Sequence, residues 1–74
     1  MYEDYLFFDI EVFKYNSIVV FKDIDGNTVK VFSSSLNGLG EYLDRGISIE
    51  QGYRNLKSFV REKTLVGYNN HFYD

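Results

Sequence analysis

The chain of 74 residues contains no cysteine and no proline, and it has a single histidine. Without cysteine there is neither a disulfide framework nor a thiolate metal site, and such a composition is typical of a reducing cytoplasm. A metal ion would have to be held by carboxylates or by that histidine, which favours hard cations such as Mg²⁺ or Mn²⁺. We therefore expect a cytoplasmic protein whose metal chemistry, if present, uses oxygen ligands.

Long apolar runs are also missing from the sequence. No stretch of about 18 apolar residues occurs, so we expect no membrane-spanning helix. The first residues, MYEDY, are acidic rather than basic, which argues against a signal peptide. The formal net charge of −3 argues against a protein that coats nucleic acid by charge alone. It leaves open an enzyme that binds nucleic acid through bound metal ions.

What the sequence does contain is apolar surface, because 45% of its residues are hydrophobic and 19% are aromatic. A chain this rich in aromatic side chains has enough apolar surface to fold rather than remain disordered. Its length allows one small domain and no more. We therefore treat residues 1–74 as a single domain.

Three β-strands are predicted in the first half of the chain. Residues 5–13, YLFFDIEVF, form a strand that is largely apolar on both faces, which is typical of a central strand covered on both sides. The alternation places Leu6, Phe8, Ile10 and Val12 on one face, and Tyr5, Phe7, Asp9, Glu11 and Phe13 on the other. Residues 17–23 and 28–33 flank the turn sequence DIDGN and predict a hairpin. Together the three strands predict an antiparallel meander.

The second half predicts helices and one more strand. Residues 35–46 suggest a short helix or a loop with one helical turn, because glycines interrupt a helical leucine spacing. Residues 48–63 predict the best helix, since Ser48 and Gln51 have capping-box spacing. Its apolar stripe is Ile49, Tyr53, Leu56, Phe59 and Val60. Residues 64–69 predict a fourth strand parallel to an earlier one, with a further helix beginning near residue 70.

Two carboxylates, Asp9 and Glu11, lie two residues apart on the first predicted strand and therefore point the same way. Like charges side by side repel each other, and burial among aromatic side chains raises the cost. A divalent cation would compensate for both charges. The alternative is that this end of the strand emerges into solvent, which is the commoner explanation for an arbitrary D-x-E pair.

The sequence FDIEVF, followed about sixty residues later by GYNNHFYD, resembles the first two motifs of the DEDD superfamily of 3′-5′ exonucleases. These are the proofreading domains of DNA polymerases and their relatives. Asp9 and Glu11 match the D-x-E motif, and Asn70, Tyr73 and Asp74 match N-x-x-[FY]-D. The compact, aromatic-rich second motif is most similar to polymerases of bacteriophages. The cytoplasm in question would then be that of a bacterium or of a phage-infected cell.

This resemblance implies an α/β, ribonuclease H-like fold with a mixed sheet in the order β-β-β-α-β. The chain would be the N-terminal part of that domain, truncated before its last helices and strand. The family also needs a fourth carboxylate, in a Y-x-x-x-D or H-x-x-x-x-D motif on a later helix, and no residue of this chain is left to supply it. We therefore expect the chain alone to be inactive.

The implied reaction is two-metal hydrolysis of a 3′-terminal phosphodiester, with two Mg²⁺ or Mn²⁺ ions in the complete domain. In that scheme the catalytic and metal-binding residues are Asp9, Glu11 and Asp74. Asp9 would bridge the ions, Glu11 would bind one ion and orient the attacking water, and Asp74 would hold the second ion. The implied partners are the 3′ end of single-stranded DNA and the remainder of a polymerase chain.

The substrate contacts implied by the resemblance come from Asn70, Phe13 and Phe72. Asn70 would contact the DNA strand, and the two phenylalanine rings would stack on terminal bases. Each has a plainer explanation, because asparagine often caps helices and phenylalanine is more often a core residue. His71 lies inside the second motif and is expected at the surface. Basic side chains that could meet phosphates are Lys14, Arg54, Lys57 and Arg61, although a solvated helix face suits the last three better.

Two other functions remain open. The chain would be a non-catalytic, phage-type binding or interaction module if it kept the core of the fold and lost the chemistry. A ribonuclease H-like protein of another type, such as a junction nuclease or a transposase core, shares the first aspartate but has no reason to carry N-x-x-[FY]-D. Truncation of the family's domain would remove the further strand and helices, which would leave the predicted fourth strand as an exposed edge. We therefore also expect a homodimer or higher assembly through that edge.

Overall fold

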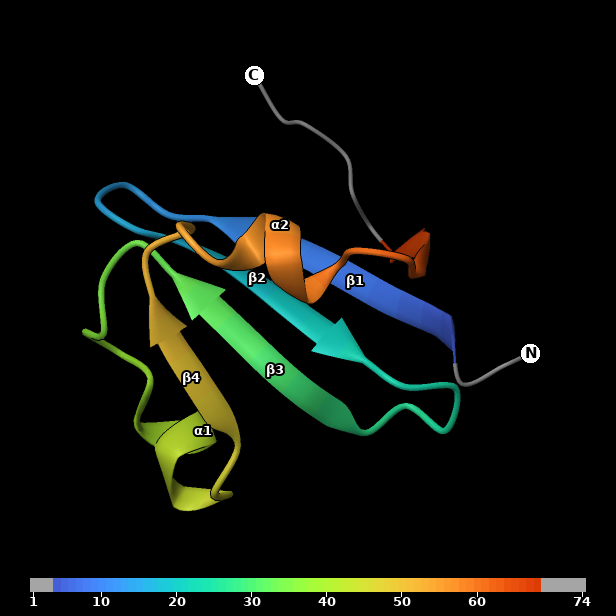
Figure 1. The fold of residues 1–74 in the computed structure, drawn as a ribbon. Coiled ribbons are helices and arrows are strands. Elements are labelled where there is room, and N and C mark those ends of the chain that lie inside the picture. The colour runs from blue at the N-terminus through green and yellow to red at the C-terminus, as the bar shows by residue number, and fades with distance from the viewer. Residues whose placement is uncertain (1–3, 69–74) are drawn as a thin grey trace.

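A five-stranded mixed sheet forms the centre of the computed structural model, which describes residues 4–68 (Figure 1). The strands are β1 (Tyr5–Val12), β2 (Ser17–Lys22), β3 (Thr28–Ser33), β4 (Ser48–Gln51) and β5 (Thr64–Tyr68), and the short helices are α1 (Gly40–Asp44) and α2 (Leu56–Phe59). Their order across the sheet is β4-β3-β2-β1-β5. β1 pairs antiparallel with β2 and parallel with β5, while β3 pairs antiparallel with β2 and parallel with β4. The α/β class with a mixed sheet is therefore confirmed.

The first three strands form the predicted antiparallel meander. The turn between β2 and β3 is stabilised by Asp23, whose Oδ1 accepts hydrogen bonds from the backbone N–H of Asp25 at 3.0 Å and of Asn27 at 2.9 Å. Gly26 in this turn has a φ of 84°, a conformation that glycine adopts without steric cost. The hairpin predicted from DIDGN is thus confirmed.

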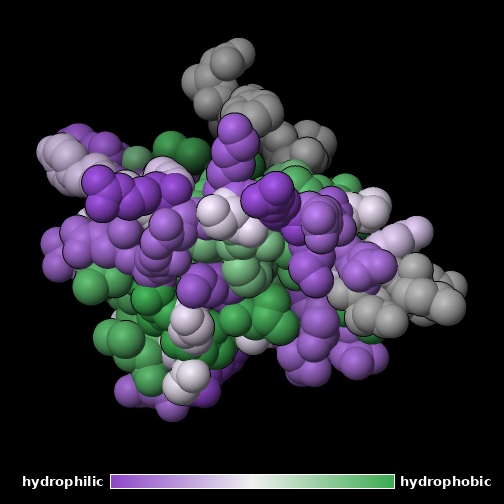
Figure 2. All heavy atoms as spheres, viewed as in Figure 1, coloured by the Kyte–Doolittle hydropathy of each residue, from purple (hydrophilic) through white to green (hydrophobic). Residues whose placement is uncertain are grey.

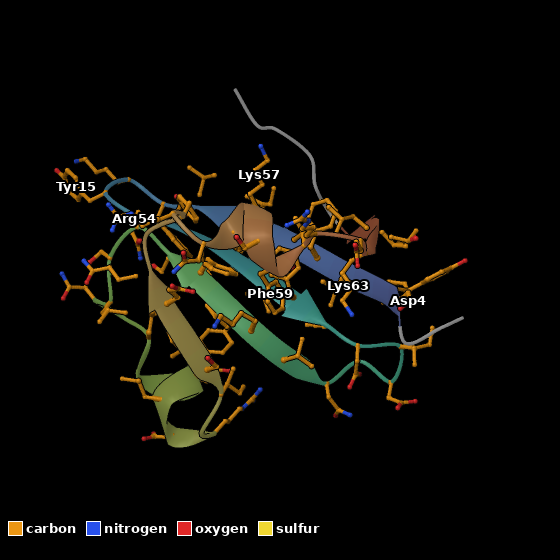
Figure 3. All side chains as sticks on the ribbon, viewed as in Figure 1. Asp4, Tyr15, Arg54, Lys57, Phe59 and Lys63 are labelled. Carbon is orange, nitrogen blue, oxygen red and sulfur yellow. The ribbon has the colours of Figure 1, made fainter. Side chains whose placement is uncertain are left out.

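The two faces of the sheet carry separate apolar clusters. The α1 cluster consists of Ile18, Val20, Val31 and Leu39, the last residue before α1. The α2 cluster consists of Leu6, Phe21 and Phe32, against which Phe8 and the α2 residue Phe59 pack. In Figure 3, Phe59 points from α2 toward the sheet, whereas Lys57 points away from it. The alternation predicted for β1 is confirmed, because Leu6 and Phe8 both belong to the α2 side.

Polar and apolar side chains are unevenly distributed on the side of the molecule seen in Figure 2. In the space-filling view, hydrophilic side chains surround α2, while hydrophobic side chains are visible over β3, β4 and α1 (Figure 2). Both helices are very short, with five residues in α1 and four in α2. Each therefore covers only part of its face of the sheet. Along the described part of the chain, no helix is long and apolar enough to cross a membrane.

The helix predicted for residues 48–63 is wrong except at Leu56–Phe59, which form α2. Residues Ser48–Gln51 form β4, paired in parallel with β3, and Ile49 packs on the α1 cluster. Gly52 follows with a φ of 84°, which ends the strand and is incompatible with a continuous helix. Pairing with the edge of β3 supplies the backbone hydrogen bonds that the N-terminal half of the helix would have made. Ser48 and Gln51 are therefore strand residues rather than a capping box.

Two other assignments of the second half are confirmed, the helical turn within residues 35–46 and the strand that begins at residue 64. Residues 35–46 contain a single helical turn, α1, preceded by Gly38 with a φ of 81°. The last strand is parallel to β1 as expected, although the insertion of β4 makes it the fifth strand and not the fourth. The helix expected near residue 70 lies outside the described residues.

Phe32 connects the sheet to α2, so its truncation is expected to unfold much of the population. The residue is fully buried, and its ring lies 5.9 Å from that of Phe21 and 5.6 Å from that of Phe59. Phe32→Ala should lower the free energy of unfolding by about 3–5 kcal/mol, which is most of the total stability of a domain this small. Urea unfolding followed by circular dichroism measures this free energy. Tyr15→Ala, at an 85% exposed position, is the control and should change it by less than about 0.5 kcal/mol.

β5 lies at the edge of the described sheet, so the expected homodimer can be tested there. Leu65 is 45% exposed on this strand. Edge strands pair with other chains unless charge or geometry blocks them, and an edge lysine is such a block. We expect dimers in sedimentation velocity at high concentration, and their loss in Leu65→Lys. A monodisperse monomer of the unmodified chain would contradict this prediction.

Candidate functional site

Asp9 and Glu11 lie on the face of the sheet that carries the α1 cluster. In the β1–β2 ladder, Asp9 is opposite Val20 and Glu11 is opposite Ile18. Opposed residues share a face, and both partners are buried members of the α1 cluster. Asp9 is partly buried and Glu11 is exposed. The two carboxylates thus lie beside an apolar cluster, on the face predicted from the alternation.

Neither carboxylate has a hydrogen bond or an ion pair with any residue between 4 and 68. Other acidic side chains have such partners. Glu41 Oε1 lies 3.3 Å from Arg45 Nη2, and Glu50 Oε2 lies 3.6 Å from Lys30 Nζ. Asp23 accepts hydrogen bonds from the backbone of its turn. In the part of the chain that the structure describes, no group of three His, Cys, Asp or Glu side chains forms a metal-binding cluster. Asp9 and Glu11 are therefore two carboxylates without a bonded partner among residues 4–68, and the exposure of Glu11 agrees with a strand end that emerges into solvent.

β5 leads the chain to these carboxylates. It runs parallel to β1, and its last residue, Tyr68, is in register with Asp9. The sequence that continues from β5 carries three of the predicted site residues, Asn70, Phe72 and Asp74, and these lie outside the described residues. The structure thus places Tyr68, two residues before the second motif, beside Asp9 of the first motif.

A groove of ≈ 560 Å³ opens at the end of β1 that carries Glu11. One wall is the β1–β2 turn, residues 13–16, and the other is formed by α1 and the loop before it. The lining residues are Glu11, Phe13, Lys14, Tyr15, Asn16, Ile18, Asn37, Gly38, Glu41 and Tyr42. Phe13 is 52% exposed here, so it is not a core residue. This volume is within the range of pockets that hold small ligands.

The β1–β2 turn is held by Asn16, a residue that the sequence patterns did not single out. Its Oδ1 accepts hydrogen bonds from Ser33 Oγ at 3.0 Å, Ser34 Oγ at 2.7 Å and the backbone N–H of Ser35 at 3.1 Å. The backbone N–H of Phe13 in turn donates to the Asn16 carbonyl at 2.7 Å. These bonds tie the turn that carries Phe13 to the end of β3. Only the tertiary pairing of β2 with β3 brings these groups together.

Tyr42 is the other groove residue that sequence reasoning missed. It belongs to α1, and its ring packs against the α1 cluster. Burial raises the pKa of the Tyr42 phenol above its usual value of 10.0, and the negative charges of Glu11, Glu41 and Asp9 raise it further, while Arg45 lowers it. Tyr42 therefore lies in the electrostatic field of two of the three predicted metal ligands, Asp9 and Glu11. No spacing in the sequence relates it to them.

The basic residues divide between two regions. Lys14 lines the groove, and its Nζ lies 5.2 Å from the centre of the Tyr15 ring at the outer end of the turn (Figure 3). Arg54, Lys57 and Arg61 are exposed around α2, which packs on the opposite face of the sheet. The preference for a solvated surface at these three positions agrees with their exposure. Lys14 is the basic residue that the fold places next to Glu11.

Comparison with known proteins identifies no relative, because no family model, no curated protein and no solved structure matches the chain. The function must therefore be inferred from the chemistry and geometry of the site. Its described part consists of two carboxylates, a half-exposed aromatic ring, one lysine and one tyrosine. The two carboxylates lie on β1, which pairs with the strand that leads into the second motif, and the other three residues line the groove with Glu11.

The field at Tyr42 provides a test of this arrangement. Glu11→Gln removes a negative charge that opposes ionisation, so the pKa of the Tyr42 phenol should fall toward 10.0. Ultraviolet titration of the phenolate measures this, with Tyr42→Phe assigning the signal. Glu50→Gln is the matched control, because Glu50 pairs with Lys30 and does not contribute to the Tyr42 pKa. An unchanged Tyr42 titration in Glu11→Gln would contradict the geometry.

The same raised pKa predicts a loss of stability at alkaline pH. The folded state holds the Tyr42 proton more tightly than the unfolded state, whose tyrosines titrate near the usual 10.0. The contribution is therefore fully present below pH 10 and is lost as the pH rises through the pKa of the folded protein. Thermal unfolding between neutral and alkaline pH should show a smaller decrease in Tyr42→Phe than in the unmodified chain.

Proposed function

We propose that the chain is the N-terminal part of a metal-dependent 3′-5′ exonuclease domain of the proofreading type found in DNA polymerases. The observation that carries the proposal is the parallel pairing of β5 with β1. This pairing aligns Tyr68, which precedes the N-x-x-[FY]-D sequence by two residues, with Asp9 of the D-x-E sequence. Two segments about sixty residues apart along the chain therefore lie on neighbouring strands.

The sheet topology supports the same proposal. An antiparallel meander of three strands, followed by a helix and a strand parallel to the first, is the β-β-β-α-β arrangement implied by a ribonuclease H-like fold. In the structure this series is β1, β2, β3, α2 and β5. β4 is an additional edge strand beyond β3, and it lies away from Asp9 and Glu11.

The chemistry of the donors fits a hard divalent cation. Asp9 and Glu11 offer oxygen ligands on one face with no positive side chain bonded to them among residues 4–68, and Asp74 would add a third carboxylate. Bound Mg²⁺ or Mn²⁺ would supply an activated water and stabilisation of the leaving 3′ oxygen. The chain's own residues would hold the ions through Asp9, Glu11 and Asp74. Pairing of β1 with β2 on one side and β5 on the other limits the motion of the Asp9 backbone.

The exposed position of the Phe13 ring favours a substrate whose bases can stack on it. Its ring is half-exposed, lines the groove beside Glu11, and is positioned by the Asn16 hydrogen bonds at the turn. An aromatic ring in this position stacks on a base of any sequence, as proofreading of an arbitrary 3′ end requires. Asn70 and Phe72 would complete the contacts to single-stranded DNA.

A binding module without chemistry is the second candidate function. The observation in its favour is that no group of three metal-binding side chains comes together within residues 4–68. Phe13, Lys14 and Tyr42 would serve such a module equally well. The two functions differ in whether a divalent cation binds at Asp9 and Glu11.

Metal binding is therefore the decisive measurement. In ¹H–¹⁵N correlation spectra, Mn²⁺ should broaden the amide signals around Asp9 and Glu11 selectively, and excess Mg²⁺ should reverse the broadening. Asp9→Asn should abolish the effect because it removes a charged ligand. Asp25→Asn, at an exposed acidic position of the β2–β3 turn, is the matched control and should leave it unchanged. Mn²⁺ broadening that is unchanged in Asp9→Asn would favour the binding module.

Nuclease activity of the 74-residue chain tests the need for a fourth carboxylate. We expect no digestion of single-stranded DNA labelled at its 5′ end, even with saturating Mg²⁺, because the ligand set is incomplete. Mg²⁺-dependent digestion from the 3′ end that disappears in Asp9→Ala would contradict this expectation and would support the exonuclease directly.

A further inference from the structure

The groove beside Glu11 has two walls from distant parts of the sequence, and each wall carries one donor group. Lys14 is on the β1–β2 turn, and Tyr42 is on α1. Phe13 lines the same groove. A ligand in the groove would therefore meet an ammonium group from one side and a phenol from the other.

Both donors are available for a ligand. Among the described residues, Lys14 forms no ion pair and contacts the Tyr15 ring, and the Tyr42 hydroxyl forms no hydrogen bond. Tyr53 behaves differently, because its hydroxyl donates to the Ser17 carbonyl at 2.8 Å and lies 2.6 Å from Ser17 Oγ. The Tyr53 hydroxyl therefore stabilises the sheet, whereas the Tyr42 hydroxyl makes no such contribution.

The charges of the groove explain why a phosphate would need these two donors. Glu11 and Glu41 both line it and repel an anion, although Glu41 is paired with Arg45 at 3.3 Å. An ammonium group attracts a phosphate by charge, and a neutral phenol donates a hydrogen bond without adding negative charge. Lys14 therefore contributes the positive charge among the groove residues, and Tyr42 contributes a neutral hydrogen-bond donor.

We propose that the phosphate backbone of single-stranded DNA lies in this groove, held between Lys14 and Tyr42, with Phe13 stacking on an adjacent base. The proposal rests on the proposed function and adds α1 as a substrate-binding element. Tyr42 is a substrate-binding residue in this arrangement and does not act on the metal site. Lys14 contributes charge, and Tyr42 contributes a directional contact.

The test is the binding of a short thymidine oligonucleotide with a fluorescent 5′ label, followed by fluorescence anisotropy in Ca²⁺ at several salt concentrations. Lys14→Met should weaken binding about ten-fold and lower the slope of log affinity against log salt by about one. Tyr42→Phe should weaken binding about ten-fold, the usual effect of a lost hydrogen bond to a charged group, and leave the salt slope unchanged. Tyr53→Phe is the matched control and should leave affinity unchanged while lowering stability.

The outcomes separate this inference from the proposed function. If the unmodified chain binds and both variants weaken it as stated, the inference is supported. If the chain binds while Tyr42→Phe and Lys14→Met retain full affinity, the groove is not the binding surface and the inference is wrong, but the exonuclease proposal stands. If the chain does not bind the oligonucleotide although Mn²⁺ broadens Asp9 and Glu11, the inference is overturned and the metal site remains. An unchanged thermal midpoint of Tyr42→Phe at neutral pH shows that lost affinity is not lost folding.

Discussion

The parallel pairing of β1 with β5 is the constraint on which the rest of the candidate site depends. Tyr68 and Asp9 are in register, so the chain leaves the sheet beside the first carboxylate. Parallel neighbours need a connection that crosses over the sheet, and α2 is the helix before β5 that packs on one face. A shift of one residue in this register would move the side chains of β5 to the opposite face. The register of β5 against β1 thus depends on how firmly α2 packs.

That packing relies on aromatic rings. Phe21, Phe32 and Phe59 lie 5.2 to 5.9 Å apart between the sheet and α2, and Lys30 lies over two of these rings. A helix of four residues has little stability of its own, so its position must come from such tertiary contacts. The phenylalanine cluster on one face therefore supports the position of the carboxylates on the other face. The role of the rings is structural, while their effect on the site is indirect.

On the opposite face of the sheet, the short helix α1 forms part of the groove. α1 has five residues and no buried member, yet it follows the fully buried Leu39, which anchors it on the sheet. This anchoring places Tyr42 in the field of Glu11 and Asp9 and makes α1 one wall of the groove. The other wall is set by Asn16, which ties the β1–β2 turn to the serines after β3. The groove is thus shaped by two contacts between segments far apart in sequence.

The amino-acid sequence by itself determined the meander, the hairpin turn and the shared face of Asp9 and Glu11. These features follow from period-two alternation and from Gly26 in a tight turn, which are local properties of the chain. Tertiary structure decided that Ser48–Gln51 is a strand, because pairing with β3 outweighed a helical pattern of side chains. It also decided that Tyr42, Lys14 and Phe13 line one groove with Glu11. Phe13 and Lys14 follow Glu11 in the sequence and are among the contacts expected from it. Tyr42 shares no spacing with them and meets them only when the sheet forms, so no pattern in the sequence identifies it.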